Sequence, residues 1–263
     1  MVDWAQVFGD KLSAFKELQD APWGRLRYTV GLANLQRHLS GQPLCILDAG
    51  GGNGVEAIPL AAQGHTVTLL DLTGEMLAEA RSNAEVSGVA ERMTFYQADL
   101  AAIPDLFPEA QFHLVLCHNV LQYAGDLGAA TAAVCHPLRP GGLISVICVN
   151  RYSEPYRQAL MQLDLDAAYA SLDAKTVFAY TFGVPVQAYV AEDLYEPLGQ
   201  AGCSVIGQYG VRCVNDYIFD NNLKADPAFF ARLERLELAL TDRYPYYLLA
   251  RFFQLIARKK ADG

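Results

Sequence analysis

The sequence predicts an α/β fold built on a doubly wound, mostly parallel, seven-stranded sheet with helices on both faces. Short apolar segments alternate with helical segments between residues 44 and 149, which is the pattern of successive strand–helix–strand units. A glycine-rich turn separates the first apolar segment from the helical segment that follows it. The 263 residues are 52% apolar, which is enough to bury one large core.

The elements can be assigned in order along the chain. Two helices are expected before the first strand, at residues 3–20 and 24–39. The seven expected strands are short apolar runs bounded by turn residues: 44–47, 66–70, 92–97, 112–117, 143–149, 204–209 and 249–257. The later expected helices are 55–63, 74–87 (capped by Thr73), 129–134, 192–200 and 227–241.

This order divides the chain into four parts. Residues 1–40 are expected to form helices that close over a ligand site, and residues 41–150 to form a nucleotide-binding core. Residues 151–190 interrupt the alternation with proline, tyrosine and mixed polarity. We expect them to form a cap inserted over the carboxyl edge of the sheet, with a helix near 156–171. Residues 191–263 then complete the sheet and the substrate side of the site.

The composition restricts the classes of partner. The net charge is −9, which argues against a broad nucleic-acid-binding face. The chain has no apolar run of membrane-spanning length, and its first 20 residues are charged and amphipathic, so a cytoplasmic protein without membrane contact is expected. The cysteines form no C-x-x-C pair and the histidines show no metal-ligand spacing. Cys45, Cys117 and Cys148 are expected to be buried reduced thiols, and no metal site is expected.

The turn from Asp48 to Gly54 is the strongest indication of a ligand. Glycines at this point let the backbone turn sharply and approach a bound molecule closely. Asp48, an acid two residues before the first glycine, would repel a pyrophosphate but suit a ligand with an ammonium group and a ribose. S-adenosylmethionine (SAM) is such a ligand. Residues 52–57 also fit G-x-G-x-x-A, so a dinucleotide such as NAD remains open on this pattern alone.

Residues 40–150 as a whole resemble the class I SAM-dependent methyltransferases. Asp48 to Gly54 matches the first motif of that family, and Asp71 ends the second strand as its second motif does. The resemblance implies a Rossmann-like core in which Asp71 and Leu72 meet the ribose, and Ala98 and Asp99 meet the adenine. The turn at residues 138–142 also matches the family and disfavours NAD.

His118 follows the fourth strand, at the edge of the sheet where acceptors bind in doubly wound folds. It is a candidate to contact the sulfonium end of SAM or to position the substrate, and a purely structural histidine is the alternative. The N-P-P-[YFW] motif of amino-group methyltransferases is absent here. This absence argues against adenine or glutamine nitrogen as the methyl acceptor.

A narrower resemblance extends over nearly the whole chain. Residues 24–27, 210–212, 216–217, 245–246 and 250–252 resemble the bacterial tRNA 5-carboxymethoxyuridine methyltransferases, which esterify a carboxylate on a wobble uridine. This resemblance implies that Arg27 holds the carboxylate of SAM and that tRNA, through its anticodon stem-loop, is the partner. The implied cofactor site comprises Arg27, Asp48, Gly50, Gly51, Gly52, Gly54, Asp71, Leu72, Ala98, Asp99 and His118. The implied catalytic and acceptor residues are His118, Arg212, Tyr246 and Arg251, with Tyr217 beside them.

A carboxylate acceptor agrees with the chemistry of these residues. A carboxylate is ionised at neutral pH, so its methylation by in-line displacement requires placement and desolvation but no base. S-adenosyl-L-homocysteine (SAH) would be the second product. The single lysine in residues 173–180 and the negative net charge count against tRNA. The alternatives are a SAM-dependent O-methyltransferase acting on a small-molecule acid or phenol, a SAM-binding module without catalysis, and an NAD oxidoreductase.

Overall fold

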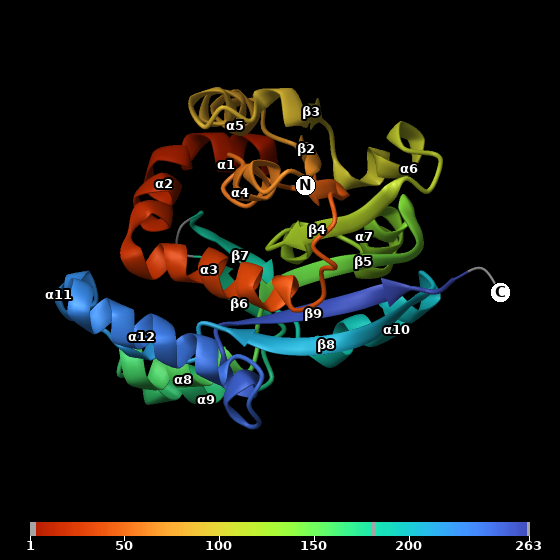
Figure 1. Ribbon diagram of the computed structural model, residues 1–263. Coiled ribbons are helices and arrows are strands. Elements are labelled where there is room, and N and C mark those ends of the chain that lie inside the picture. Colours follow the sequence, from red (N-terminus) through yellow and green to blue (C-terminus); the bar gives the residue numbers. More distant parts are fainter. Residues whose placement is uncertain (1–3, 180–181, 262–263) are drawn as a thin grey trace.

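A single seven-stranded sheet forms the centre of the molecule (Figure 1). The computed structural model describes residues 4–179 and 182–261. The strand order is β3-β2-β1-β4-β5-β9-β8, and only β9 runs antiparallel to its neighbours. The strands are β1 Cys45–Ala49, β2 Thr66–Asp71, β3 Met93–Gln97, β4 Phe112–His118, β5 Leu138–Val149, β8 Cys203–Val211 and β9 Phe252–Lys259. The predicted doubly wound fold is confirmed.

Both faces of the sheet are buried, which explains why its strands are continuous apolar runs. Leu47 and Ala49 of β1 pack into one core cluster, whereas Ile46 packs into another on the opposite face. The first cluster includes Val134 of α7 and Leu198 of α10. The second is covered by α3, α4 and α5. These helices are α3 Pro22–Gln36, α4 Ala57–Ala62, α5 Gly74–Val86, α7 Leu127–Cys135 and α10 Tyr195–Gln200.

The N-terminal segment and the C-terminal helices flank the carboxyl edge. The segment expected as one helix at residues 3–20 is broken into α1 Trp4–Asp10 and α2 Leu12–Asp20, and its first residue lies outside the described part of the chain. The remaining helices are α6 Ile103–Leu106, α11 Asn221–Ala225 and α12 Pro227–Leu240. Short 3₁₀ segments lie at Ala90–Arg92, Leu100–Ala102, Leu121–Tyr123, Ala191–Leu194, Asn215–Tyr217 and Tyr246–Leu249. None of the helices in the described ranges is long and apolar enough to cross a membrane.

The cap segment, residues 151–190, differs from its prediction. The expected helix at 156–171 is two helices, α8 Ser153–Met161 and α9 Leu165–Ala170. A hairpin of β6 Thr176–Ala179 and β7 Val184–Gln187 follows, which the sequence did not indicate. The hairpin buries Val177 and Val186 against a third core cluster that includes Val30 of α3 and Ile147 of β5. The hairpin therefore packs against the sheet edge and the N-terminal helices together.

Three local expectations were wrong. Thr73 occupies the N-cap position of α5, but its side chain forms no cap hydrogen bond within the described chain, and its Oγ1 is buried without a partner there. Cys45 is exposed, because it begins the strand at the amino edge of the sheet. The last strand begins at Phe252 rather than at residue 249, because residues 246–249 form a 3₁₀ turn.

Candidate active site

The glycine-rich loop after β1 adopts the conformation that its sequence predicts. Gly50, Gly52 and Gly54 have φ angles of 78°, 54° and 81°, which side chains rarely allow. A Cβ atom on Gly50 would lie 2.4 Å from Cγ2 of Val120, and one on Gly51 would lie 2.6 Å from Oδ2 of Asp48. The loop therefore packs closely against Val120, which follows β4, and against the side chain of Asp48. A larger residue at either position would displace the loop.

Asp71 ties the second strand to this glycine loop. Its Oδ2 accepts a hydrogen bond from the N–H of Gly52 at 2.9 Å, and its Oδ1 accepts one from the N–H of Thr73 at 2.9 Å. Burial raises the pKa of the Asp71 carboxyl above its ordinary value, and these backbone bonds oppose the rise. The carboxylate therefore lies at the junction of two loops, where a ribose would meet it.

Asp48 provides the clearest test of whether SAM fits. Its side chain is buried, and its Oδ2 has no hydrogen-bond partner among the described residues. Burial, together with the charges of Glu56 and Asp71, raises the pKa of Asp48 well above its ordinary value. A cationic ligand would relieve both the repulsion and the missing hydrogen bond. SAM fits this acidic loop because it carries an ammonium group and ribose hydroxyls.

The segment predicted to contact adenine is held in place mostly by hydrogen bonds to the backbone. The N–H of Ala98 donates to the carbonyl of Asp71 at 3.0 Å, and Gln97 Nε2 donates to the carbonyl of Leu72 at 3.2 Å. Asp99 Oδ1 accepts the N–H of Ala101 at 2.8 Å and so caps the 3₁₀ segment after it. These contacts place the predicted adenine residues beside the predicted ribose acid.

His118 lies at the end of β4 with both ring nitrogens engaged. Nδ1 is 2.7 Å from Oε1 of Glu56, and Nε2 is 2.7 Å from Oγ of Ser145. Burial opposes ionisation of Glu56, but His118 and then Arg27 outweigh it, so its pKa lies below the ordinary value. Glu56 is thus an anion that His118 and Arg27 both stabilise. The sequence did not single out Glu56.

A chain of buried side chains continues from Ser145 across the sheet. Gln254 Nε2 donates both to Ser145 Oγ, at 3.0 Å, and to the carbonyl of Gly31, at 3.1 Å. The Ser145 hydroxyl can then donate its own hydrogen to Nε2 of His118, which leaves Nδ1–H to donate to Glu56. Asn34 Nδ2 donates to Oε1 of Gln254 at 3.0 Å. The network holds the ring of His118 in place and is consistent with a hydrogen on Nδ1.

Arg27 reaches the same region from α3. Its guanidinium carbon lies 4.4 Å from the ring centroid of Tyr28 and 5.8 Å from that of Phe252. The α2 helix is fastened to the cofactor loop by a reciprocal amide pair: Asn53 Nδ2 donates to Gln19 Oε1 at 2.7 Å, and Gln19 Nε2 donates back at 3.2 Å. The N-terminal helices therefore cover the glycine loop.

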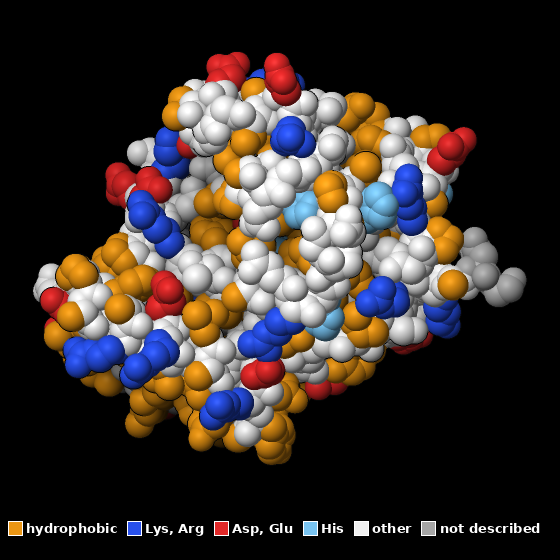
Figure 2. Space-filling model, viewed as in Figure 1, with side chains coloured by type: hydrophobic (Ala, Val, Ile, Leu, Met, Phe, Trp, Pro, Cys, Tyr) orange, Lys and Arg blue, Asp and Glu red, His pale blue; other side chains and the backbone are white. Residues whose placement is uncertain are grey.

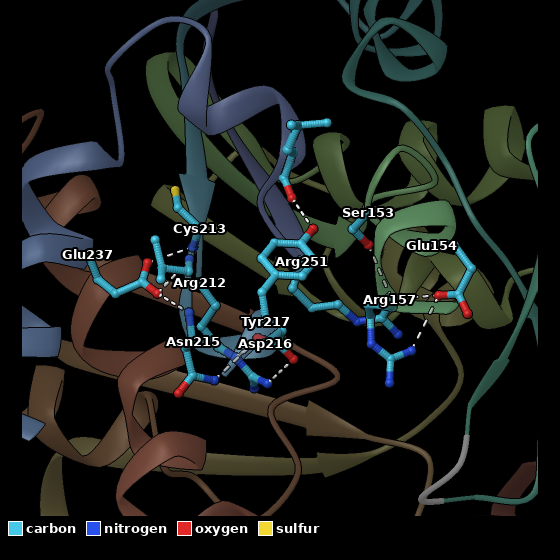
Figure 3. Close-up of polar contacts among 12 residues, drawn as sticks. Ser153, Glu154, Arg157, Arg212, Cys213, Asn215, Asp216, Tyr217, Glu237 and Arg251 are labelled. Atoms are coloured by element: carbon cyan, nitrogen blue, oxygen red, sulfur yellow. Dashed lines mark hydrogen bonds and ion pairs between the residues drawn. The ribbon is translucent and has the colours of Figure 1, made fainter. Parts of the chain in front are cut away.

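The predicted acceptor arginines form a buried polar cluster beside this region (Figure 3). Arg212, with φ 64°, donates to both carboxylate oxygens of Asp216, and its Nε lies 2.6 Å from Oδ2. Arg251 Nη1 donates to Glu154 Oε2 at 2.9 Å and to Ser153 Oγ at 3.2 Å. The cluster holds its arginines in place with internal acids, which spacing in the sequence did not indicate.

The two predicted tyrosines take different positions. The hydroxyl of Tyr217 donates to the carbonyl of Leu249 at 2.5 Å, so it braces the turn before β9 (Figure 3). Tyr246 is 53% exposed on that turn, and the structure does not bring it into the buried cluster. Arg212 and Arg251 do share a neighbour with Arg27, because their guanidinium carbons lie 5.4 and 5.9 Å from the Phe252 ring centroid.

Glu237 is a further residue that sequence reasoning missed. Its fully buried carboxylate accepts the backbone N–H groups of Cys213 (2.5 Å), Val214 (2.9 Å) and Asn215 (2.7 Å) (Figure 3). It thereby fixes the loop that follows Arg212. An acid within the apolar stripe of α12 was a signal in the sequence, since such a residue requires buried partners.

Comparisons with known proteins agree with this geometry. Residues 46–142 match a family described as a methyltransferase domain. The chain is 30% identical over 239 residues to the tRNA 5-carboxymethoxyuridine methyltransferase of Escherichia coli K12, covering 90% of this chain and 89% of the relative. It is 34% identical over 126 residues to a ubiquinone biosynthesis O-methyltransferase of Xylella fastidiosa M23, covering 46% and 48%.

Solved structures show the same fold. A SAM-dependent methyltransferase from Mesorhizobium loti has a TM-score of 0.62 at 20% identity, covering 92% of this chain and all of that chain. A Burkholderia thailandensis 1,6-didemethyltoxoflavin N1-methyltransferase with bound SAH has a TM-score of 0.57 at 19% identity, covering 98% and 89%.

Proposed function

The chain belongs to the class I SAM-dependent methyltransferases, and we propose that it methylates the carboxylate of 5-carboxymethoxyuridine in tRNA. SAM is the cofactor, and SAH is its product. The relative that supports this substrate matches nine-tenths of the chain at 30% identity. A tRNA substrate also implies a cytoplasmic location.

The observation that carries the proposal is the double engagement of His118. Nδ1 faces Glu56 and Nε2 faces Ser145, so neither ring nitrogen is available to take a proton from an acceptor. A phenol or an alcohol has to lose a proton during methylation, whereas a carboxylate arrives ionised at neutral pH. A site whose histidine is held in this way suits an acceptor that needs no base.

The reaction then depends on placement. When bound, SAM supplies a methyl group attached to a positively charged sulfur. A carboxylate oxygen of the acceptor would form a bond to the methyl carbon as the carbon–sulfur bond breaks, and the electron pair would stay on sulfur, which gives SAH. Asp48, Asp71 and Arg27 would hold the donor, while His118 and Glu56 keep the edge of the sheet rigid. Alignment and exclusion of water supply the rate enhancement.

The buried arginine cluster supports an anionic acceptor. Glu154 lies within reach of both Arg251, at 2.9 Å, and Arg157, at 3.4 Å, and Asp216 pairs with Arg212. Three guanidinium groups thus lie beside Glu154 and Asp216, so an acceptor carboxylate would have cationic neighbours there. The side chain of Arg251 is only 11% exposed, and burial is the main cause that lowers its pKa, so an additional anion would be stabilising there.

A local basic surface supports the RNA partner despite the negative net charge. Arg232 and Arg235 of α12 are exposed, and Arg243 is exposed in the turn that follows. Figure 2 shows Lys and Arg side chains gathered at the lower left, where α11 and α12 lie in the same view of Figure 1. The buried face of the same helix carries Glu237, which binds the Arg212 loop, so α12 presents this basic surface outward and packs against the acceptor side with its other face. It can contact phosphates without requiring a basic protein overall.

Transfer of tritium from methyl-labelled SAM tests the function. Bulk tRNA from cells that lack the methyl ester should acquire label, and mild alkali should release it as methanol, since the product is an ester. Label that appears only in a small-molecule extract would reject tRNA and support the small-molecule O-methyltransferase. Alkali-stable label in tRNA would reject the carboxylate as acceptor.

A further inference from the structure

Asn119 carries an amide group that the described fold does not use. Both Oδ1 and Nδ2 are buried, and neither has a hydrogen-bond partner within the described chain. Each unpaired buried polar atom costs free energy, because it gives up hydrogen bonds to water without replacement. Such a group in a native protein calls for a partner outside the fold.

The backbone alone does not account for an asparagine here. Asn119 has a φ of 59°, which asparagine tolerates better than most residues. Glycine would adopt the same conformation without burying an amide, and the backbone N–H is already satisfied by the carbonyl of Ile147 at 2.7 Å. The presence of the buried amide side chain therefore requires a separate explanation.

The neighbours of Asn119 place it beside the cofactor loop. The residue before it is His118, which pairs with Glu56, and the residue after it is Val120, whose Cγ2 abuts Gly50 of the cofactor loop. Gln122, three residues after Asn119, is also buried, and its Oε1 has no hydrogen-bond partner in the described ranges. Two residues with unpaired amide atoms thus belong to one segment, which packs against Gly50 through Val120 and against Trp4 of α1 through Tyr123.

We propose that the Asn119 amide recognises the imide edge of the acceptor base. Its Nδ2–H would donate to O4 of the uracil, and its Oδ1 would accept N3–H, which satisfies both atoms at once. O4 is bonded to the carbon next to the one that bears the carboxymethoxy arm, so this contact would orient the reacting oxygen. The inference rests on the proposed function and adds a residue that reads the base to those that hold the carboxylate.

The chemistry of Asn119 selects this partner over the cofactor. A carboxylate such as that of SAM would use the amide donor only and would face Oδ1 with a like partial charge. The ammonium group and ribose of SAM are provided for by Asp48 and Asp71, and the adenine by Asp99. A ligand edge with one donor beside one acceptor is what the amide complements.

The test uses Asn119→Gly in the full chain, with two anticodon stem-loop RNAs. One RNA carries 5-carboxymethoxyuridine, and the other carries its N3-methyl analogue, which has lost the N–H. Asn119→Gly should lower kcat/KM for the first RNA by about 10- to 100-fold, as expected for a bidentate contact. The dissociation constant of SAH should stay within error, and the melting temperature of the ligand-free protein should not fall, because the variant removes two unpaired buried polar atoms. Wild type should prefer the first RNA, and the variant should lose that preference.

Leu163→Gly is the matched control. Leu163 also has a positive φ, 54°, but it is 82% exposed between α8 and α9, so its replacement should leave kcat/KM unchanged. If Asn119→Gly is as active as wild type, asparagine is present only for its backbone and the inference is wrong. If SAH affinity falls by the same factor as kcat/KM, Asn119 serves the cofactor instead. Wild type that methylates neither RNA contradicts the proposed function and removes the basis of the inference with it.

Discussion

Arg27 lies over the ring of Phe252, with its guanidinium carbon 5.8 Å from the ring centroid. The same ring has Arg212 at 5.4 Å and Arg251 at 5.9 Å. Phe252 is buried at the start of β9, where the last strand meets the carboxyl edge of the sheet. One aromatic side chain therefore sets the spacing between the arginine assigned to the donor and the two assigned to the acceptor.

We predict that Phe252→Leu weakens both halves of the site together. The substitution keeps an apolar side chain but removes the ring face, and each cation–π contact contributes about 0.5–2 kcal/mol. SAH affinity and KM for tRNA should each worsen by roughly 3- to 30-fold. Calorimetry and steady-state kinetics measure these two effects. Phe219→Leu, at a ring that is 76% exposed, should change neither. A loss confined to one ligand would show that the ring does not link the two halves.

His118 should act by position rather than by proton transfer. Because both of its nitrogens are engaged, kcat/KM for a carboxylate acceptor should stay flat between pH 6 and 9. His118→Gln leaves Glu56 as a buried anion with a weaker partner, so the melting temperature and SAH affinity should fall. The shape of the pH profile should nevertheless match that of wild type. A rise near neutral pH that disappears in the variant would instead identify His118 as a base.

Binding of tRNA should depend on the exposed arginines of α12. Replacing Arg232 and Arg235 by alanine removes two candidate phosphate contacts, so the slope of log K against log salt should decrease by roughly 1.5. Affinity at low salt should fall, while methylation of the free nucleoside should not. Filter binding at several salt concentrations provides the measurement. Arg81 and Arg92, exposed near β3 at the other edge of the sheet, provide the matched double variant, which should keep the full slope.

The strands of the sheet and the cofactor loop could be predicted because their signals are local. Buried parallel strands read as apolar runs, and the turn around Gly50 requires glycine at fixed positions. The engagement of Arg251 by Glu154 could not be predicted in this way. Arg251 and Glu154 are separated by 97 residues, and sequence spacing carries no information about such pairs.

The cap segment shows a second limit. Its hairpin joins β6 and β7 by pairing Val177 with Val186. These strands are short, and their burial depends on α3 and β5 rather than on alternation within the segment. The boundary of β9 was missed for a related reason, because residues 246–249 are apolar but turn before the strand begins. Apolar composition indicated burial there without indicating the backbone conformation.

The buried charge of Asp48 should lower the free energy of unfolding of the cofactor-free protein, although the same charge favours cofactor binding. Its folded pKa is raised, so the folded protein binds a proton more tightly than the unfolded chain does. Stability lost to this group is therefore largest at pH values above the raised folded pKa, and it is recovered as the pH falls through that pKa toward the unfolded value near 3.8. Asp48→Asn removes the buried charge with little change in shape. It should raise the melting temperature of the cofactor-free protein by a few degrees at neutral pH, and the gain should shrink in acid.

The same substitution should weaken the binding of SAM, because the ammonium group of SAM loses its anionic partner. Thermal melts at several pH values, with and without saturating SAH, separate the two effects. SAH should stabilise wild type more than it stabilises Asp48→Asn. The difference between the two melting temperatures should therefore shrink or change sign when SAH is present. Asp105→Asn, at an exposed acid of α6, should alter neither curve. Equal stabilisation of wild type and Asp48→Asn by SAH would show that the unpaired oxygen of Asp48 is not a cofactor contact.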